Sequence, residues 1–194
     1  MLVNTIDDSL KIECRANPYR QDENDRVLVL LDVRNVCSRQ GSDYSNSRID
    51  YAKQLRDVIG IRKCVAAIAV DGVQYDERGK DVSRIFHEEI RMSGYRLEFV
   101  PASNNKGKQE GADIKIALIA LRYAMENKCD VVELITGDGD FTVLVQELHA
   151  CNILVSVTAF YRSLSYSLKD SADQVTILDE MPIVKMSALT AELV

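Results

Sequence analysis

The sequence predicts an α/β domain with a mostly parallel central sheet of about five to six strands and helices on both faces. Short apolar runs alternate with longer segments whose apolar residues recur at helical spacing, as they do in successive β-α-β units. The short runs are apolar throughout, which is typical of strands that are covered on both faces. A length of 194 residues allows one such domain with a substantial core and leaves too little chain for a second.

The apolar runs predict six strands, at residues 27–33, 65–70, 95–100, 131–136, 153–158 and 175–178. The first, VLVLLDV, and the fourth, which leads into GDGDF, are the most distinctive. A short extra strand near 10–14 stays open as an alternative to a flexible arm. Because right-handed crossovers orient parallel strands alike, we expect the carboxyl ends of these strands to lie at one edge of the sheet.

The helical periodicity predicts helices at 47–59, 81–92, 112–126, 140–150 and 163–170. In the third of these, Ile114, Leu118, Leu121 and Met125 recur at helical spacing, so this is the best-defined helix of the chain. We expect polar loops at 39–46 and 103–111, because both segments are rich in Gly, Ser and Asn. The chain then divides into an arm at 1–25, a domain at 26–179 and a tail at 180–194.

Composition narrows the class of protein. The formal charge of −6 argues against a protein that coats nucleic acid, although an enzyme that cuts it can hold a local acidic cluster. Five scattered cysteines without a C-x-x-C pair indicate buried thiols in a reducing compartment. No apolar run reaches membrane-spanning length and no basic start precedes an apolar core, so we expect a cytoplasmic protein without a membrane partner. The two histidines, His87 and His149, are expected to be ordinary helix residues.

Acidic residues follow the strands at the edge where their carboxyl ends meet. Asp32 ends the first strand, Asp113 begins the helix after the basic loop, and Asp138 and Asp140 follow the fourth strand. Oxygen-only ligands suit Mg²⁺ or Mn²⁺, which activate water and stabilise charge on a phosphodiester. We therefore expect these four acids to be catalytic and to bind the metal.

Simpler, purely structural roles could also explain these acids. Asp138 and Asp140 could cap the helix that follows them, where acids suit the helix dipole. Asp113 could be a first-turn acid of its helix, and Asp71 is interpreted as a turn residue before Gly72. For Asp32 a functional role is favoured, because an unpaired negative charge at the end of an apolar strand would destabilise the folded state.

The flanking residues complete the candidate site. Gly137 and Gly139, on either side of Asp138, are expected to adopt backbone angles that a side chain would resist. Lys106 and Lys108, together with Arg34 or Arg39, could contact the phosphate of a substrate. A solvated loop explains the two lysines equally well.

The segments LLDVRN, KGKQEGADIKIALIAL, VVELITGDGDF and SLSYSLKDSADQV resemble the NYN domain family, in particular its bacterial LabA-like members, over about 27–178. That family is related to PIN-domain nucleases. The resemblance implies a PIN-like three-layer α/β/α domain and metal-dependent ribonuclease activity. Its metal-binding acids would fall on Asp32, Asp113, Asp138 and Asp140, with Asn35 as a polar partner.

The chain departs from the family pattern at one point. The family usually has glycine after the first aspartate, whereas Val33 follows Asp32 here. Because valine prefers extended backbone, the first loop is expected to differ in shape. Asp173 matches an acid that is common late in the family and could be purely structural.

Three functions follow from these observations. The first is a Mg²⁺- or Mn²⁺-dependent ribonuclease with an RNA substrate. The second is a regulatory or RNA-binding module, catalytically weak or inactive, that acts through a partner or as a homodimer. The third, a phosphatase of the haloacid-dehalogenase type, is disfavoured because that type needs Asp-x-Asp at the first strand and Arg34 stands in the place of the second acid.

Overall fold

The computed structural model describes residues 19–38, 47–73, 83–100, 111–178 and 184–185. Its centre is a six-stranded parallel sheet in the order β4-β3-β1-β5-β6-β7. The bounds are β1 Arg26–Asp32, β3 Lys63–Gly72, β4 Arg96–Val100, β5 Val131–Ile135, β6 Leu154–Ala159 and β7 Gln174–Ile177. The predicted α/β class with a parallel sheet of five to six strands is confirmed.

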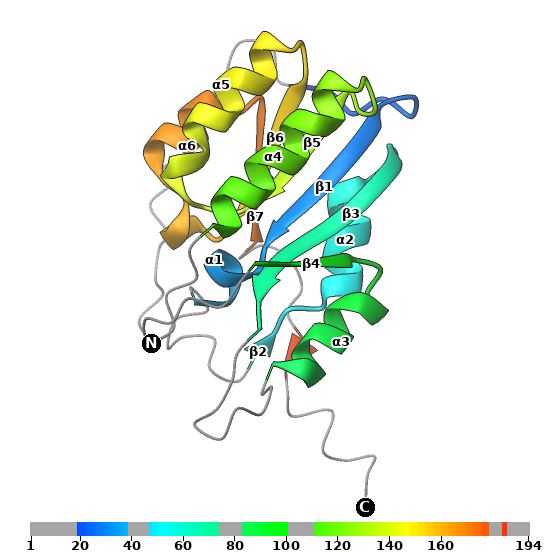
Figure 1. Cartoon of the computed structure of the whole chain (residues 1–194), viewed down its shortest axis with the longest axis vertical. Coiled ribbons are helices and arrows are strands. Elements are labelled where there is room, and N and C mark those ends of the chain that lie inside the picture. The colour runs from blue at the N-terminus through cyan, green and yellow to red at the C-terminus, as the bar shows by residue number, and fades with distance from the viewer. Residues whose placement is uncertain (1–18, 39–46, 74–82, 101–110, 179–183, 186–194) are drawn as a thin grey trace, which may run out of the picture.

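Helices cover both faces of the sheet, so the domain has three layers (Figure 1). One face carries α4 (Ala112–Met125), α5 (Thr142–Ala150) and α6 (Tyr166–Ser171). The other carries α1 (Val33–Ser38), α2 (Tyr51–Ile59) and α3 (Arg84–Met92). Two short 3-10 turns, η3 (Gly139–Phe141) and η4 (Tyr161–Ser163), follow β5 and β6. The predicted three-layer PIN-like architecture is confirmed.

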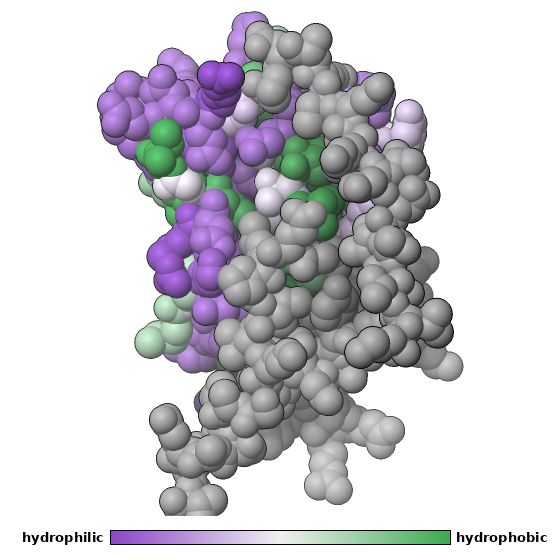
Figure 2. Space-filling model, turned by 180° about the vertical axis from the view of Figure 1, so that it is seen from behind, coloured by the Kyte–Doolittle hydropathy of each residue, from purple (hydrophilic) through white to green (hydrophobic). Residues whose placement is uncertain are grey.

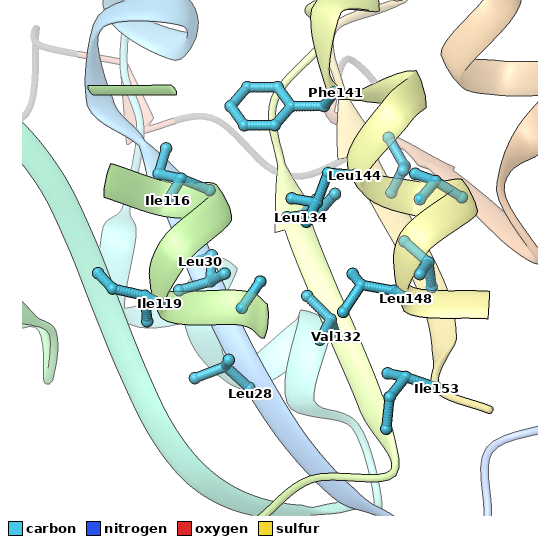
Figure 3. Close-up of a cluster of buried hydrophobic side chains, with 14 of the residues drawn as sticks. Leu28, Leu30, Ile116, Ile119, Val132, Leu134, Phe141, Leu144, Leu148 and Ile153 are labelled. Atoms are coloured by element: carbon cyan, nitrogen blue, oxygen red, sulfur yellow. The ribbon is translucent and has the colours of Figure 1, made fainter. Parts of the chain in front are cut away.

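The core consists of two apolar clusters, one on each face of the sheet. Figure 3 shows part of the first cluster, where Leu28 and Leu30 of β1 and Val132 of β5 lie opposite side chains of α4 and α5. The intervening residues of β1, including Val29, belong to the second cluster beneath α2 and α3. Burial on both faces explains why β1 and β5 are apolar at successive positions instead of alternating with polar residues.

The surface differs from the core in composition. Figure 2 shows the side opposite to that of Figure 1, where the described surface is mostly hydrophilic with scattered hydrophobic residues. None of the described helices combines the length and apolar character that crossing a membrane requires.

The order of the strands creates a switch point in the sheet. From β1 the chain continues to β3 and β4 on one side, and it later returns to add β5, β6 and β7 on the other. Neighbouring strands whose connections leave in opposite directions open a crevice at their carboxyl ends, where α/β proteins bind ligands. Here the switch point lies between the ends of β1 and β5.

Several element boundaries differ from the sequence predictions. Val33 begins α1 instead of ending the strand in extended conformation. The side chain of Asp32 accepts a hydrogen bond from the backbone N–H of Asn35, three residues on, at 3.1 Å. Such a bond is the pattern of a helix N-cap and explains why a short helix follows the strand directly.

The first predicted helix, at 47–59, begins later than expected. Asp50 accepts a hydrogen bond from the N–H of Lys53 at 2.8 Å, which caps α2 at Tyr51. The preceding residues form β2 (Ser47–Arg48), which pairs antiparallel with β8 (Val184–Lys185) from the predicted tail. The strand considered near 10–14 lies outside the described residues.

The expectation of buried cysteines is wrong for two of them. Cys129 is buried and Cys37 is half-buried, but Cys64 and Cys151 are exposed. Cys64 lies near the beginning of β3, where the strand extends beyond the cover of the helices. Apolar sequence neighbours therefore do not ensure burial at the end of a strand. Cys14 lies outside the described residues.

Candidate functional site

Asp32 lies at the carboxyl end of β1 and is almost fully buried, with 4% of its surface exposed. Both of its carboxylate oxygens accept hydrogen bonds. Oδ1 accepts from the N–H of Asn35, and Oδ2 accepts from the hydroxyl of Thr136, each at 3.1 Å. These bonds fix the carboxylate at the switch point between β1 and β5.

The loop after β5 is tied to the same point. The N–H of Gly137 donates to Oδ1 of Asn35 at 2.9 Å, and the N–H of Asp138 donates to Oγ1 of Thr136 at 3.2 Å. Asn35, a predicted substrate-binding residue, thus uses its side-chain oxygen to join the start of α1 to this loop. Asp32 and Asp138 are therefore connected through one hydroxyl group.

Asp138 also caps the turn that follows it. Its Oδ1 accepts a hydrogen bond from the N–H of Asp140 at 3.0 Å, so the helix-capping interpretation of Asp138 is correct. The cap occupies one carboxylate oxygen. Asp138 is half-buried and Asp140 is exposed. Capping and metal binding remain compatible, because a capped carboxylate retains its second oxygen.

The two glycines of this loop have a different role from the one expected. Neither has a positive φ, so the prediction of unusual backbone angles is wrong. A Cβ on Gly137 would lie 2.4 Å from the backbone oxygen of Ser163, and one on Gly139 would lie 2.8 Å from Oγ of Ser165. The glycines therefore allow the segment 163–167 to approach the acidic loop. A positive φ occurs instead at Gly111, directly before α4.

Sequence reasoning did not place the serine-rich segment 163–167 at the site. The N–H of Ser165 donates to the carbonyl oxygen of Gly137 at 2.9 Å, which fastens this segment to the acidic loop. The side chain of Ser165 caps α6 by accepting from the N–H of Leu168. The repeated serines and the paired glycines were the available signals, but only the folded structure shows that they meet.

The four predicted acids affect one another electrostatically. The pKa of Asp32 is raised to about 6, mainly by burial; the negative charges of Asp113 and Asp138 contribute to the rise, whereas the hydrogen bonds from Asn35 and Thr136 oppose it. Partial removal of its carboxylate from water raises the pKa of Asp113, and Asp138 and Asp140 add to the rise. The neighbouring negative charges therefore disfavour ionisation of Asp32 and Asp113, and a bound cation would reverse this effect.

The donor chemistry of this edge fits Mg²⁺ or Mn²⁺. All four acids offer oxygen, which these hard cations prefer. Within the described ranges, no three carboxylate, imidazole or thiol side chains converge into a closed metal site. Magnesium usually binds one or two carboxylates and completes its shell with water and substrate phosphate, so a closed protein cage is not required.

A second polar group lies beside the site, at the end of β3. Asp71 is buried and pairs with His87 of α3, whose Nε2 lies 2.9 Å from Oδ2 of the aspartate. Oδ1 of Asp71 accepts from the N–H of Gly72 and lies 3.7 Å from Nε of Arg34. The interpretation of Asp71 as a turn residue is therefore wrong, because Asp71 belongs to β3, whereas His87 lies in a helix as expected and is buried against Asp71.

The other predicted residues have different positions. His149 pairs with Asp173 at 2.8 Å, and Asp173 also accepts from the N–H of Val155. Asp173 directly precedes β7, so it lies at the edge of the sheet opposite to the acids. Lys106, Lys108 and Arg39 lie outside the described residues.

Comparison with known proteins agrees with this geometry. The three-layer fold with acids at its switch point defines a PIN-like α/β domain. The model of the NYN domain family matches residues 26–179, and the chain belongs to this family. The match names the family and no branch of it.

A solved structure has a similar fold. It is the crystal structure of a protein of unknown function from Vibrio parahaemolyticus, with 26% sequence identity and a TM-score of 0.70. The similarity covers 86% of this chain and all 100% of the other. No curated protein matches the chain.

Proposed function

We propose that the protein is a metal-dependent ribonuclease that hydrolyses phosphodiester bonds of RNA with Mg²⁺ or Mn²⁺. The observation that supports this most is the electrostatics of Asp32. It is buried, and the charged groups that act on it most strongly are the acids Asp113 and Asp138. Membership of the NYN family adds support, because this family is related to PIN-like nucleases.

The metal would be held by Asp32 and Asp138, with Asp113 and Asp140 as further ligands, directly or through water. Asp113 and Asp140 are exposed, so their side chains have room to rotate towards a cation. A metal at this edge supplies a water of lowered pKa and stabilises the charge that develops on phosphorus.

The chain's own residues orient this chemistry. Thr136 and the backbone of Asn35 hold the carboxylate of Asp32 in one orientation. Arg34, two residues after Asp32, would contact a non-bridging phosphate oxygen, since guanidinium groups suit phosphate geometry. Lys106 and Lys108 would contact neighbouring phosphates. RNA in the cytoplasm is the proposed substrate.

The test is cleavage of a labelled pool of single-stranded and hairpin RNA by purified protein in Mn²⁺, Mg²⁺ or EDTA. Asp138→Asn removes a proposed ligand, whereas Asp173→Asn removes a carboxylate at the opposite edge and serves as the control. We expect metal-dependent cutting by the parent and by Asp173→Asn, and none by Asp138→Asn. Equal cutting by all three proteins would contradict the assignment of the site.

A second candidate is an RNA-binding or regulatory module of the same family. The absence of three converging ligands in the described part of the chain favours it, as does the capping role of Asp138. Such a module would bind RNA with or without metal and leave it intact, alone or as a homodimer. The cleavage assay, run beside an RNA-binding assay, separates the two functions.

A further inference from the structure

The buried pair formed by Asp71 and His87 has no role in the proposed chemistry so far. Both side chains are only 3% exposed. The ring of His87 packs against Phe99, with a centroid separation of 5.0 Å, and next to Phe86. A carboxylate enclosed in this way is costly unless hydrogen bonds and opposite charge compensate it.

The position of Asp71 connects it to the candidate active site. In the parallel pairing of β1 with β3, Asp32 lies opposite Val70, so Asp71 is one residue further along the same edge. The thiol of Cys37, on α1, is affected by the charges of Asp71, Asp32 and Arg34 together. These three charged groups therefore share one neighbourhood at the carboxyl ends of β1 and β3.

Arg34 is the side chain that the Asp71–His87 pair can hold in place. Its Nε is buried without a hydrogen-bond partner and lies 3.7 Å from Oδ1 of Asp71. Its side chain as a whole is 37% exposed, so Arg34 combines a buried Nε with a side chain that solvent can reach. The contact holds the base of the guanidinium by charge and leaves its outer N–H groups for a ligand.

We infer that Asp71, held in place by His87, positions Arg34 to contact the substrate phosphate beside Asp32. Asp71 and His87 are positioning residues that do not themselves touch the substrate. This inference rests on the proposed function, because it assumes that a phosphodiester occupies the acidic edge. It explains why a buried carboxylate, an imidazole and an arginine from β3, α3 and α1 meet next to that edge.

The test is a double-mutant cycle of RNA affinity with Arg34→Ala, Asp71→Asn and the double variant. All three are made in an Asp138→Asn background, in which the labelled RNA remains intact during fluorescence anisotropy with Mg²⁺. We expect Asp71→Asn to weaken binding roughly tenfold when Arg34 is present, because one charge-assisted contact loses its orientation. When Arg34 is already alanine, the same change should have less than about a twofold effect.

Two further variants distinguish positioning from folding. His87→Gln keeps an N–H that can donate to Asp71 and should retain most of the affinity, whereas His87→Leu should resemble Asp71→Asn. Asp173→Asn, in the second histidine–aspartate pair, should leave RNA affinity unchanged. Circular dichroism and melting temperature show whether each variant is folded.

The outcomes are separable from those of the proposed function. An effect of Asp71→Asn that is equally large with and without Arg34 would overturn the positioning role and leave the ribonuclease intact. A parent protein that binds no RNA would overturn both. Loss of affinity that depends on Arg34 supports the inference, whether or not the parent cuts RNA.

Discussion

Burial raises the pKa of two carboxylates on neighbouring strands, but the charged groups around them differ. Glu133 of β5 receives hydrogen bonds from Arg62, at 3.0 Å, and from the hydroxyl of Thr158, at 2.7 Å. Asp32 of β1 receives hydrogen bonds too, but the charges that act on it most are those of Asp113 and Asp138. Within the residues that the structure describes, the fold therefore supplies a cation for Glu133 and none of comparable influence for Asp32.

This difference indicates a structural role for the charge of Glu133 and supports the proposed functional role of the charge of Asp32. Breaking a buried pair leaves an uncompensated charge and costs stability, so the Arg62–Glu133 pair serves the fold. A buried acid among other acids is destabilising by itself and makes sense where an external cation binds. The carboxyl edge of the sheet is thus the part of the molecule where we propose that a cation binds.

The largest effect on stability is expected at the compensated pair. Arg62→Met should lower the free energy of unfolding by about 3–5 kcal/mol, because it leaves Glu133 buried without its cation. Chemical denaturation measures this loss. Arg91→Met, in the exposed pair with Glu88, is the control and should cost no more than about 1 kcal/mol. Equal losses in the two variants would remove the distinction.

Substitution of Asp32, whose strongest charged neighbours are acids, should raise the stability of the metal-free protein instead of lowering it. Since its pKa rises from 3.8 to about 6 on folding, the folded state holds the proton more tightly. The stabilisation that protonated Asp32 contributes to the folded state is fully present below pH 4. It is lost as the pH rises through 6, which lowers the free energy of unfolding by about 3 kcal/mol. Asp32→Asn should therefore stabilise the metal-free protein at pH 7.5 and have little effect at pH 4.

Added Mn²⁺ should reduce the difference between these two proteins at pH 7.5, because it stabilises only the form with an ionised Asp32. Thermal unfolding in EDTA and in Mn²⁺ measures both effects. An Asp32→Asn protein less stable than the parent at pH 7.5 in EDTA would show that the carboxylate is compensated within the chain.

The same substitution, Asp32→Asn, should lower activity although it raises stability. Asp32→Asn should reduce RNA cleavage roughly 100-fold or more, because a neutral amide binds a divalent cation poorly. Initial rates under saturating Mn²⁺ measure the loss. A variant that is both more stable and inactive would identify Asp32 as a functional charge, and an active one would argue against its role as a ligand.

The smallest expected effect tests the contact between the acidic loop and the serine-rich segment. Gly137→Ala should cost about 1–3 kcal/mol, because the nearest atom to the new Cβ is a backbone oxygen, at 2.4 Å. Gly139→Ala faces a serine hydroxyl at 2.8 Å that can rotate away, so its cost should be smaller. Denaturation midpoints of the two variants compare them directly, and a smaller cost for Gly137→Ala would contradict the packing.

Much of the fold was predictable because apolar runs report burial on both faces. The six strands follow from that pattern, whereas the long helix α4 follows from helical spacing, although Ile114, Leu118 and Met125, which define that spacing, are exposed. Helix α1 has only six residues, which is too short for a periodic signal, and its capping bond from Asn35 to Asp32 was hidden in a motif interpreted as catalytic. Strands β2 and β8 have two residues each and depend on a partner more than 130 positions away.

The site was predictable in part for a similar reason. Asp32 and Asp138 follow strands, so parallel topology brings them to one edge. The pairing of Asp71 with His87 and the approach of Ser163 to Gly137 depend on side-chain packing between separate segments. No local pattern reports such contacts, because neither partner shows periodicity or spacing that points to the other.

The most direct test of the central claim is a calorimetric titration of Mn²⁺ into the parent protein, Asp138→Asn and Asp173→Asn at pH 7.5. The surroundings of Asp32 predict saturable binding to the parent and to Asp173→Asn. Binding to Asp138→Asn should be weaker by about tenfold or more, as expected when one of a few oxygen ligands is lost. Equal binding to all three proteins, or no binding to the parent, would contradict a metal site at the switch point.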